Sequence, residues 1–70
     1  MESHKVGMNI RKIRLSLGLN IREFSKVVHL SPSHISCIEN GKRRLTIDNL
    51  IKICNLFHIK AETLLGEDEA

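Results

Sequence analysis

Residues 30–43 read LSPSHISCIENGKR and contain the strongest local signal in this chain. Ser31 followed by Pro32 is typical of a helix start, because proline at the first helical position lacks only an N–H group that would be unpaired there. Proline also favours extended backbone in the residue before it, as a capping residue requires. The Asn-Gly pair at 40–41 is typical of a helix end. The sequence therefore predicts a short helix over about residues 32–40.

A second short helix is predicted just before this one. Asn20 and Glu23, three residues apart, form a capping-box pattern. Apolar residues follow at helical spacing: Phe24, Val27 and Val28. Residues 29–31 remain as a three-residue turn between two helices. Two short helices joined by a tight turn, inside a chain with helical spacing throughout, form a helix-turn-helix pattern.

The first part of the chain predicts one amphipathic helix. Its apolar residues recur at intervals of four, three and four: Val6, Ile10, Ile13 and Leu17. Gly18 follows at once, and glycine is preferred just after a helix because it adopts positive φ without strain. We therefore expect these four residues to form one apolar stripe.

The C-terminal part predicts a fourth and a fifth helix. Thr46 is a candidate cap for the fourth helix, with Asp48 well placed in its first turn. Apolar residues cover much of its circumference: Ile47, Leu50, Ile51, Ile53, Cys54, Leu56 and Phe57. We therefore expect the fourth helix to be the buried, central one. Residues 61–65 predict a last turn or so, which Gly66 ends.

The composition is that of one small globular domain. The chain has 70 residues, of which 41% are apolar and 27% charged. It contains no run of 18 apolar residues and no hydrophobic segment of a secretory signal, so we expect neither a membrane partner nor export. Cys37 and Cys54 do not make a disulfide framework, and we expect a reduced, cytoplasmic protein.

The charge is unevenly distributed along the chain. Residues 1–60 contain eleven basic and four acidic side chains, a net charge of +7, whereas residues 61–70 contain only acidic charges. A compact basic body favours a polyanionic partner, with nucleic acid as the first candidate. We assign residues 1–66 to the domain and expect residues 67–70 to form an acidic, disordered tail.

The stretch from Ile10 to Gly66 resembles the Cro/CI-type repressors and their bacterial relatives, the XRE family. The resemblance is carried by IRKIR (10–14), GLN (18–20), LSPSHIS (30–36), IENGKR (38–43), LIKI (50–53) and LLG (64–66). It implies an all-α fold, a compact five-helix bundle of the lambda-repressor-like DNA-binding class. It also implies a homodimer that reads a palindromic operator in double-stranded DNA, with the helix at about 32–40 in the major groove.

Residue roles follow from the resemblance, position by position. Base-edge contacts are implied for Pro32, Ser33, His34 and Cys37, with Ser36 nearby. Phosphate contacts are implied for Asn20, Ser31, Asn40, Lys42, Arg43 and Arg44. Arg14 and Glu39 match a pair that ties the first helix to the third by an ion pair.

Three positions depart from the family pattern. Ile21 stands where many relatives carry a glutamine that touches the DNA backbone, so that contact is not expected. His29 replaces a turn glycine, whose positive φ costs another residue about 1 kcal/mol. Cys37 stands where relatives often carry a long polar or basic side chain, so base reading rests more on His34, Ser33 and DNA shape.

The sequence offers no catalytic constellation and no metal site. It lacks a Gly-rich phosphate loop, a nucleophile motif and paired carboxylates, so we expect neither an enzyme nor a cofactor. His34 and Cys37 have a spacing that metal ligands use, but structural zinc takes four ligands and no second pair is present at finger spacing.

The C-terminal third is more apolar than one short helix pair requires. Six apolar residues crowd into fifteen positions: Ile51, Leu56, Phe57, Ile59, Leu64 and Leu65. We expect a homodimer through this segment, with Phe57, Ile59 and Leu65 as contacts, because a two-fold contact hides the same patch on both copies. The alternative is that these residues complete the core of the monomer.

Two functions remain open from the sequence. The first is a sequence-specific, dimeric transcriptional regulator, a repressor rather than an activator, and the basic loop and the +7 body favour it. The second is an antitoxin-like or anti-repressor module that keeps the helix-turn-helix fold but acts through a protein. The neutral side chains predicted on the recognition helix keep the second function open.

Overall fold

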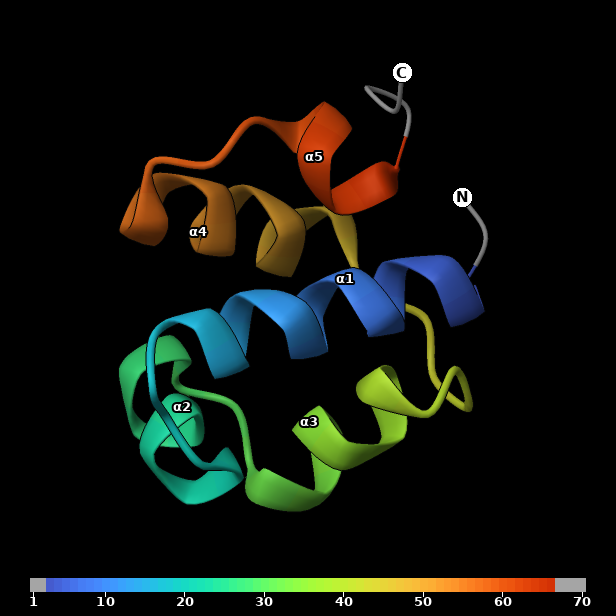
Figure 1. Cartoon of the computed structure of the whole chain (residues 1–70). Coiled ribbons are helices and arrows are strands. Elements are labelled where there is room, and N and C mark those ends of the chain that lie inside the picture. Colours follow the sequence, from blue (N-terminus) through green and yellow to red (C-terminus); the bar gives the residue numbers. More distant parts are fainter. Residues whose placement is uncertain (1–2, 67–70) are drawn as a thin grey trace.

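The computed structural model describes residues 3–66, which form five helices (Figure 1). They are α1 Ser3–Ser16, α2 Ile21–Val28, α3 Pro32–Glu39, α4 Ile47–Phe57 and α5 Ala61–Leu65. The predicted all-α, five-helix architecture is therefore confirmed. The predicted acidic tail, residues 67–70, lies outside the described residues. Within residues 3–66, no helix has the length and apolar character needed to cross a membrane.

The central helix is α1, and this corrects the expectation for α4. Figure 1 shows α1 lying between α3 on one side and α4 with α5 on the other, and α1 contacts both α3 and α5. Helix α4 buries only Leu50 and Ile53, whereas Ile47 is 60% exposed and Ile51 52% exposed. The prediction failed because α4 lies at the edge of the bundle, so its neighbours cover one face and leave its other apolar residues exposed.

The apolar stripe of α1 was predicted correctly only in its first half. Val6 and Ile10 are buried and Ile13 is half-buried, but Leu17 is 45% exposed. Helix α1 ends at Ser16, and Leu17 lies in the turn that follows it. All five helices and the α3–α4 loop contribute to the core. Its buried residues are Val6, Ile10, Phe24, Val28, Ile35, Ile38, Leu45, Leu50, Ile53 and Leu64.

The predicted helix starts are confirmed by their caps. The Asn20 side chain accepts from the Glu23 N–H at 2.8 Å, and the Glu23 carboxylate accepts from the Asn20 N–H at 2.8 Å. Thr46 Oγ1 accepts from the Asn49 N–H at 3.2 Å. Each of these caps satisfies a donor that the helix itself leaves unpaired. The starts of α2 and α4 are therefore set by residues within three positions of one another.

Candidate nucleic-acid interface

The N-terminal end of α3 is held by its own sequence. Ser31 has extended backbone angles, and its hydroxyl oxygen accepts a hydrogen bond from the His34 N–H at 3.1 Å. Pro32 lies in the first turn, where its missing N–H costs nothing. The start of the predicted recognition helix is therefore fixed by local contacts, and α3 spans Pro32–Glu39.

The base-reading candidates all lie on α3, with different exposures. Pro32 and Ser33 are exposed. His34, Ser36 and Cys37 are half-buried. At about 3.6 residues per turn, Ser33, Ser36 and Cys37 share the side of α3 opposite its buried residues, and His34 lies at the edge of that side. The outer face of α3 therefore presents small side chains with one imidazole beside them.

The turn between α2 and α3 contains a residue in left-handed conformation. His29 has φ 59° and ψ 40°, and its backbone N–H donates to the Ser25 carbonyl. The Leu30 N–H donates to the same carbonyl at 3.2 Å. The expectation that His29 occupies a position suited to glycine is thereby confirmed. These two bonds fix the direction in which the chain leaves α2 and enters α3.

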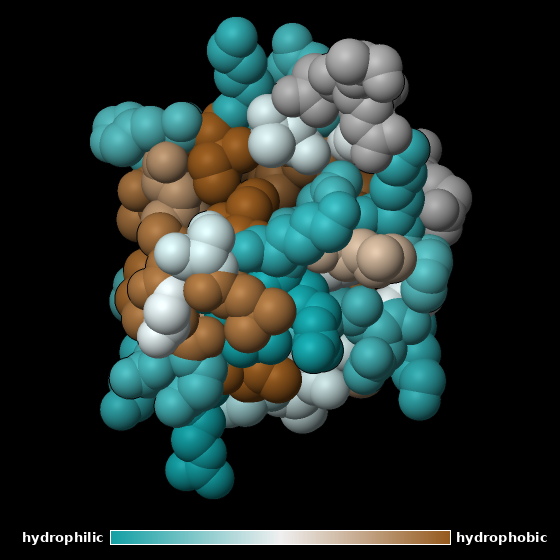
Figure 2. Space-filling view, in the orientation of Figure 1, coloured by the Kyte–Doolittle hydropathy of each residue, from teal (hydrophilic) through white to brown (hydrophobic). Residues whose placement is uncertain are grey.

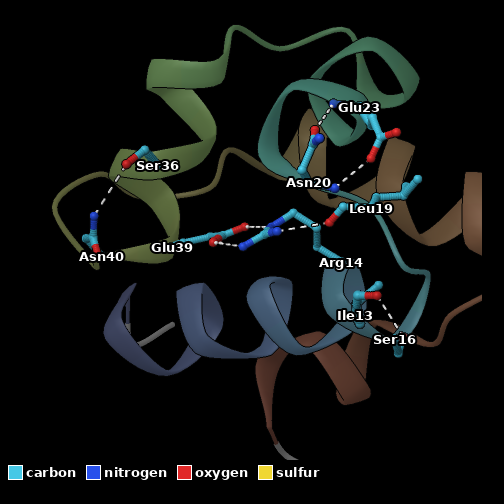
Figure 3. A network of polar contacts seen from close by, with 9 residues as sticks. All are labelled: Ile13, Arg14, Ser16, Leu19, Asn20, Glu23, Ser36, Glu39 and Asn40. Atoms are coloured by element: carbon cyan, nitrogen blue, oxygen red, sulfur yellow. Dashed lines mark hydrogen bonds and ion pairs between the residues drawn. The ribbon is translucent and has the colours of Figure 1, made fainter.

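A buried ion pair joins α1 to the C-terminal end of α3 (Figure 3). Arg14 Nε donates to Glu39 Oε2 at 2.7 Å, and Arg14 Nη2 donates to Glu39 Oε1 at 3.0 Å. Arg14 is 6% exposed and Glu39 is 7% exposed. The hydrogen bond with Glu39 raises the pKa of Arg14, against the opposing effect of burial. The structure therefore brings together the two residues that were expected to pair, in the bidentate geometry that gives strong, oriented contacts.

Arg14 also binds the connection between α1 and α2, a contact that sequence reasoning missed. Its Nη1 donates to the Leu19 carbonyl at 3.0 Å, and the Leu19 N–H donates to the Arg14 carbonyl at 3.2 Å. One side chain therefore connects the segment that leads into the helix-turn-helix with the end of α3 (Figure 3). No pattern in the sequence marks a backbone carbonyl as a partner.

Gly7 lies where the backbone of α1 meets the backbone of α3. A Cβ atom added at Gly7 would overlap the Ile38 carbonyl oxygen and would lie 3.0 Å from the Glu39 carbonyl oxygen. Only glycine therefore fits at this contact. Sequence reasoning explained glycines at helix ends and passed over this one, although a glycine inside a helical pattern often marks close packing.

The basic loop, defined as Lys42, Arg43 and Arg44, is tied back to α3. The backbone N–H groups of Lys42 and Arg43 donate to the Cys37 carbonyl at 2.9 and 3.2 Å. Leu45, only 2% exposed, anchors the far end of the loop in the core. All three basic side chains are exposed. The structure therefore places three positive charges next to the C-terminal end of α3.

The remaining phosphate-contact candidates are exposed residues at helix ends. The capping bonds of Asn20 and Ser31 use their acceptor oxygens, so the Asn20 NH₂ group and the Ser31 hydroxyl hydrogen keep their capacity to donate. Asn40 Nδ2 donates to Ser36 Oγ at 3.5 Å, a long contact. All three residues therefore combine a structural contact with an exposed position beside α3 or α2.

The dimer candidates Phe57, Ile59 and Leu65 are only partly exposed. The Phe57 ring stacks on the buried Phe24 ring with centroids 5.8 Å apart, and Ile59 and Leu65 pack against the same core. These residues therefore contribute to the core of the monomer. The exposed apolar side chains of α4 are Ile47, Ile51 and Leu56.

Large apolar side chains are exposed on α4 and also outside it. Figure 2 shows hydrophobic side chains gathered over α4 and the C-terminal end of α1, whereas hydrophilic residues cover much of the rest of the view. The exposed apolar residues outside α4 are Met8, Leu15, Leu17 and Val27.

The cysteines do not suggest a reactive centre in the described part of the chain. Cys37 and Cys54 are both free and half-buried. Burial raises the pKa of the Cys54 thiol, which keeps it protonated near neutral pH and lowers its reactivity. Among residues 3–66, no three His, Cys, Asp or Glu side chains are grouped closely enough to hold a metal ion.

Comparison with known proteins gives matches over most of the chain. A family model described as helix-turn-helix matches residues 10–64. Antitoxin PezA from Streptococcus pneumoniae is 30% identical over 64 residues, which cover 91% of this chain and 40% of PezA. The HTH-type transcriptional regulator ImmR from Bacillus subtilis is 27% identical over 64 residues, which cover 91% of this chain and 50% of ImmR. This chain therefore spans half or less of the length of these two curated relatives.

Solved structures share this fold. The restriction-modification controller protein C.AhdI from Aeromonas hydrophila matches with a TM-score of 0.77 and 24% sequence identity. The match covers 87% of this chain and 92% of C.AhdI. The five-helix arrangement is therefore shared by proteins whose sequences differ at three positions in four.

Proposed function

This chain belongs to the Cro/CI-type (XRE) family of helix-turn-helix proteins, and we propose that it is a sequence-specific transcriptional regulator that binds double-stranded DNA. In this proposal α3 enters the major groove and reads base edges. Two copies bind a palindromic operator as a homodimer and act as a repressor. The protein works in the cytoplasm and needs neither catalysis nor a cofactor.

The observation that carries this proposal is the position of the basic loop beside α3. Cations next to a groove-binding helix neutralise phosphates and release counterions, which supplies affinity without reading sequence. Because Lys42 and Arg43 are tied through their backbone to Cys37, both side chains start from fixed positions beside the end of α3. The net charge of +7 over residues 1–60 adds a long-range attraction to DNA.

We assign base reading to the outer face of α3, formed by Ser33, Ser36 and Cys37 with His34 at its edge, and to Pro32 in the first turn. The small side chains on this face let the helix axis come close to the floor of the groove, and hydroxyl groups donate to or accept from base edges. His34 supplies the longest polar side chain in the set. We assign phosphate contacts to the basic loop together with Asn20, Ser31 and Asn40.

We place the homodimer contact on the side formed by α4 and α5. Phe57, Ile59 and Leu65 form the partly exposed edge of the core there, and Ile47 and Ile51 add exposed apolar area on α4 itself. A two-fold contact hides this area on both copies at once. It also presents two recognition helices to half-sites about 34 Å apart.

Selection from a pool of randomised duplexes tests the proposed function. The full chain should recover an inverted repeat, which fluorescence anisotropy should show to be bound about 1,000-fold or more tightly than a random duplex at the same salt concentration. Variants of the basic loop need a control for the loss of one positive charge. Lys60→Ala provides this control, because Lys60 lies at the exposed start of α5, on the opposite side of α1 from α3. A pool that yields no common sequence would refute the proposal.

The second candidate function is an antitoxin-like or anti-repressor module. The 30% identity with Antitoxin PezA favours it. In this alternative the chain keeps the helix-turn-helix fold but acts mainly by binding a protein. Co-expression with the product of the neighbouring gene distinguishes the two functions. A stoichiometric protein complex, together with no recovered DNA sequence, would favour the alternative.

A further inference from the structure

Helix α1 contacts the recognition helix and α5 through opposite faces. Gly7 and Arg14 are seven residues apart, about two helical turns, so they share one face of α1, and both contact the C-terminal end of α3. Asn9 lies two residues after Gly7, on the other side of the helix. There its Nδ2 donates to the Leu64 carbonyl of α5 at 2.8 Å.

Asn9 satisfies a group that α5 cannot satisfy itself. The last carbonyls of a helix have no partner within the helix, and Leu64 belongs to the last turn of the five-residue α5. The Leu64 side chain is fully buried, so α5 meets α1 both through an apolar side chain and through a bonded carbonyl. At the other end of α5, the capping residue Lys60 makes no side-chain capping bond. The amide of Asn9 is therefore a directional contact that fixes how α5 is oriented on α1.

We propose that Asn9 is a positioning residue that sets the half-site spacing read by the dimer. This inference rests on the proposed DNA-binding function and on the proposed dimer contact at α4 and α5. In that dimer, the separation of the two α3 helices depends on how α4 and α5 are held against the rest of each copy. One connection runs through α5 and α1 to α3, and a second runs from Phe57 to Phe24 in α2.

Along the connection through α1, the contact with α3 and the contact with α5 are fixed by different kinds of interaction. The contact of α1 with α3 is fixed twice, by the Arg14–Glu39 ion pair and by the close backbone approach at Gly7. The contact of α1 with α5 is oriented by the Asn9 amide. Without that amide, α5 and the partner copy attached to it shift relative to α3. Each single α3 still fits one half-site, but the two copies no longer favour one separation.

The experiment measures binding of the full chain to three duplexes by fluorescence anisotropy. One duplex carries a single half-site from the selected sequence, one carries the selected inverted repeat, and one carries that repeat with one base pair inserted. We expect Asn9→Ala to reduce the preference for the selected spacing about fivefold, the effect of one net hydrogen bond. Binding to the single half-site should stay within about twofold of the wild type.

Two further variants keep the test decisive. Asn9→Leu preserves the size and shape of the side chain but removes the donor without adding a charge, so it should reduce the spacing preference even if Asn9→Ala folds poorly. Met8→Ala removes an exposed side chain next to Asn9 on α1, away from the proposed dimer contact, and should leave all three affinities unchanged. Thermal melts by circular dichroism establish that each variant is folded.

The outcomes separate this inference from the function on which it rests. An unchanged spacing preference in both Asn9 variants overturns the inference, as does an equal loss on the half-site and on both repeats. A wild-type chain that binds both spacings equally also overturns it. A wild-type chain that recovers no DNA sequence overturns the proposed function itself.

Discussion

Arg14 and Glu39 lie 25 residues apart in the sequence and meet as a buried, bidentate ion pair between α1 and α3. The same guanidinium donates to the Leu19 carbonyl just before α2. The pair therefore orients both helices of the helix-turn-helix against α1. Its contribution is positional, since neither residue is exposed enough to reach DNA.

We predict that Arg14→Ala lowers the free energy of unfolding by about 3–5 kcal/mol, because it leaves the Glu39 carboxylate buried without its partner. Urea unfolding followed by circular dichroism measures this loss. Arg11→Ala, at an exposed position on the same helix, should change stability by no more than about 0.5 kcal/mol. Replacing both partners by Met and Leu should recover most of the loss. A loss below about 1 kcal/mol for Arg14→Ala would mean that the pair behaves as a surface pair.

Gly7→Ala should destabilise the fold although alanine is the better helix former by about 1 kcal/mol. The new Cβ would overlap the Ile38 carbonyl oxygen, and backbone atoms cannot move aside without separating α1 from α3. We expect a net loss of about 1–3 kcal/mol in urea unfolding. Gly18→Ala is the matched control: its Cβ would meet nothing within 4 Å, but φ is +71°, so only backbone strain of about 1 kcal/mol is expected. A Gly7→Ala variant as stable as the wild type would contradict the close approach.

The sequence predicted those parts of the fold whose signals are local. Asn20 with Glu23, and Ser31 with Pro32, mark helix starts because donor and acceptor lie within a few residues of each other. The positive φ of His29 was implied by the family resemblance, because His29 stands at the position of the family's turn glycine, and the structure has φ 59° there.

The parts that the sequence did not predict depend on contacts between distant segments. The Asn9–Leu64 bond spans 55 residues, and nothing near Asn9 indicates which carbonyl it reaches. Ile47 and Ile51 have the spacing of a buried helix face, but their exposure is decided by the position of α4 at the edge of the bundle. Apolar spacing indicates a helix and one of its faces, whereas burial depends on what that face meets.

In the basic loop, Arg43→Ala should weaken binding to operator and random duplexes by similar factors. Removing one phosphate contact should also reduce the slope of log affinity against log salt by about one unit. Anisotropy titrations at several salt concentrations measure both effects, and Lys60→Ala should leave the slope unchanged. If the ratio of operator to random affinity collapses while random binding holds, the loop reads bases and the assignment is wrong.

On the outer face of α3, Ser33→Ala or His34→Ala should relax discrimination at defined base positions. Each good base contact contributes about 1–3 kcal/mol to discrimination against the wrong base. Affinities for a set of operators, each changed at one base pair, measure the effect. Unchanged discrimination across the whole set would remove the residue from the base-reading surface.

The apolar side of α4 and α5 predicts a dimer in the absence of DNA. Analytical ultracentrifugation should show the wild type as a dimer at tens of micromolar, and Ile51→Glu, at an exposed position, should be monomeric and folded. Ile59→Glu should also disrupt the dimer, but at a cost in stability, because Ile59 packs against the core. A wild type that stays monomeric would contradict a preformed dimer, and a folded, dimeric Ile51→Glu would exclude this surface.

The tether between the basic loop and Cys37 also has a kinetic consequence. Phosphates repeat along every DNA duplex, so contacts made by Lys42 and Arg43 are available on DNA of any sequence. A loop whose backbone is already fixed to α3 loses little conformational freedom when it meets them. If the proposed DNA-binding function holds, this arrangement suits the chain to sliding along DNA with the outer face of α3 turned towards the groove. The basic loop would then govern the rate at which the protein finds its DNA site. Helix α3 would govern how long the protein stays bound to that site.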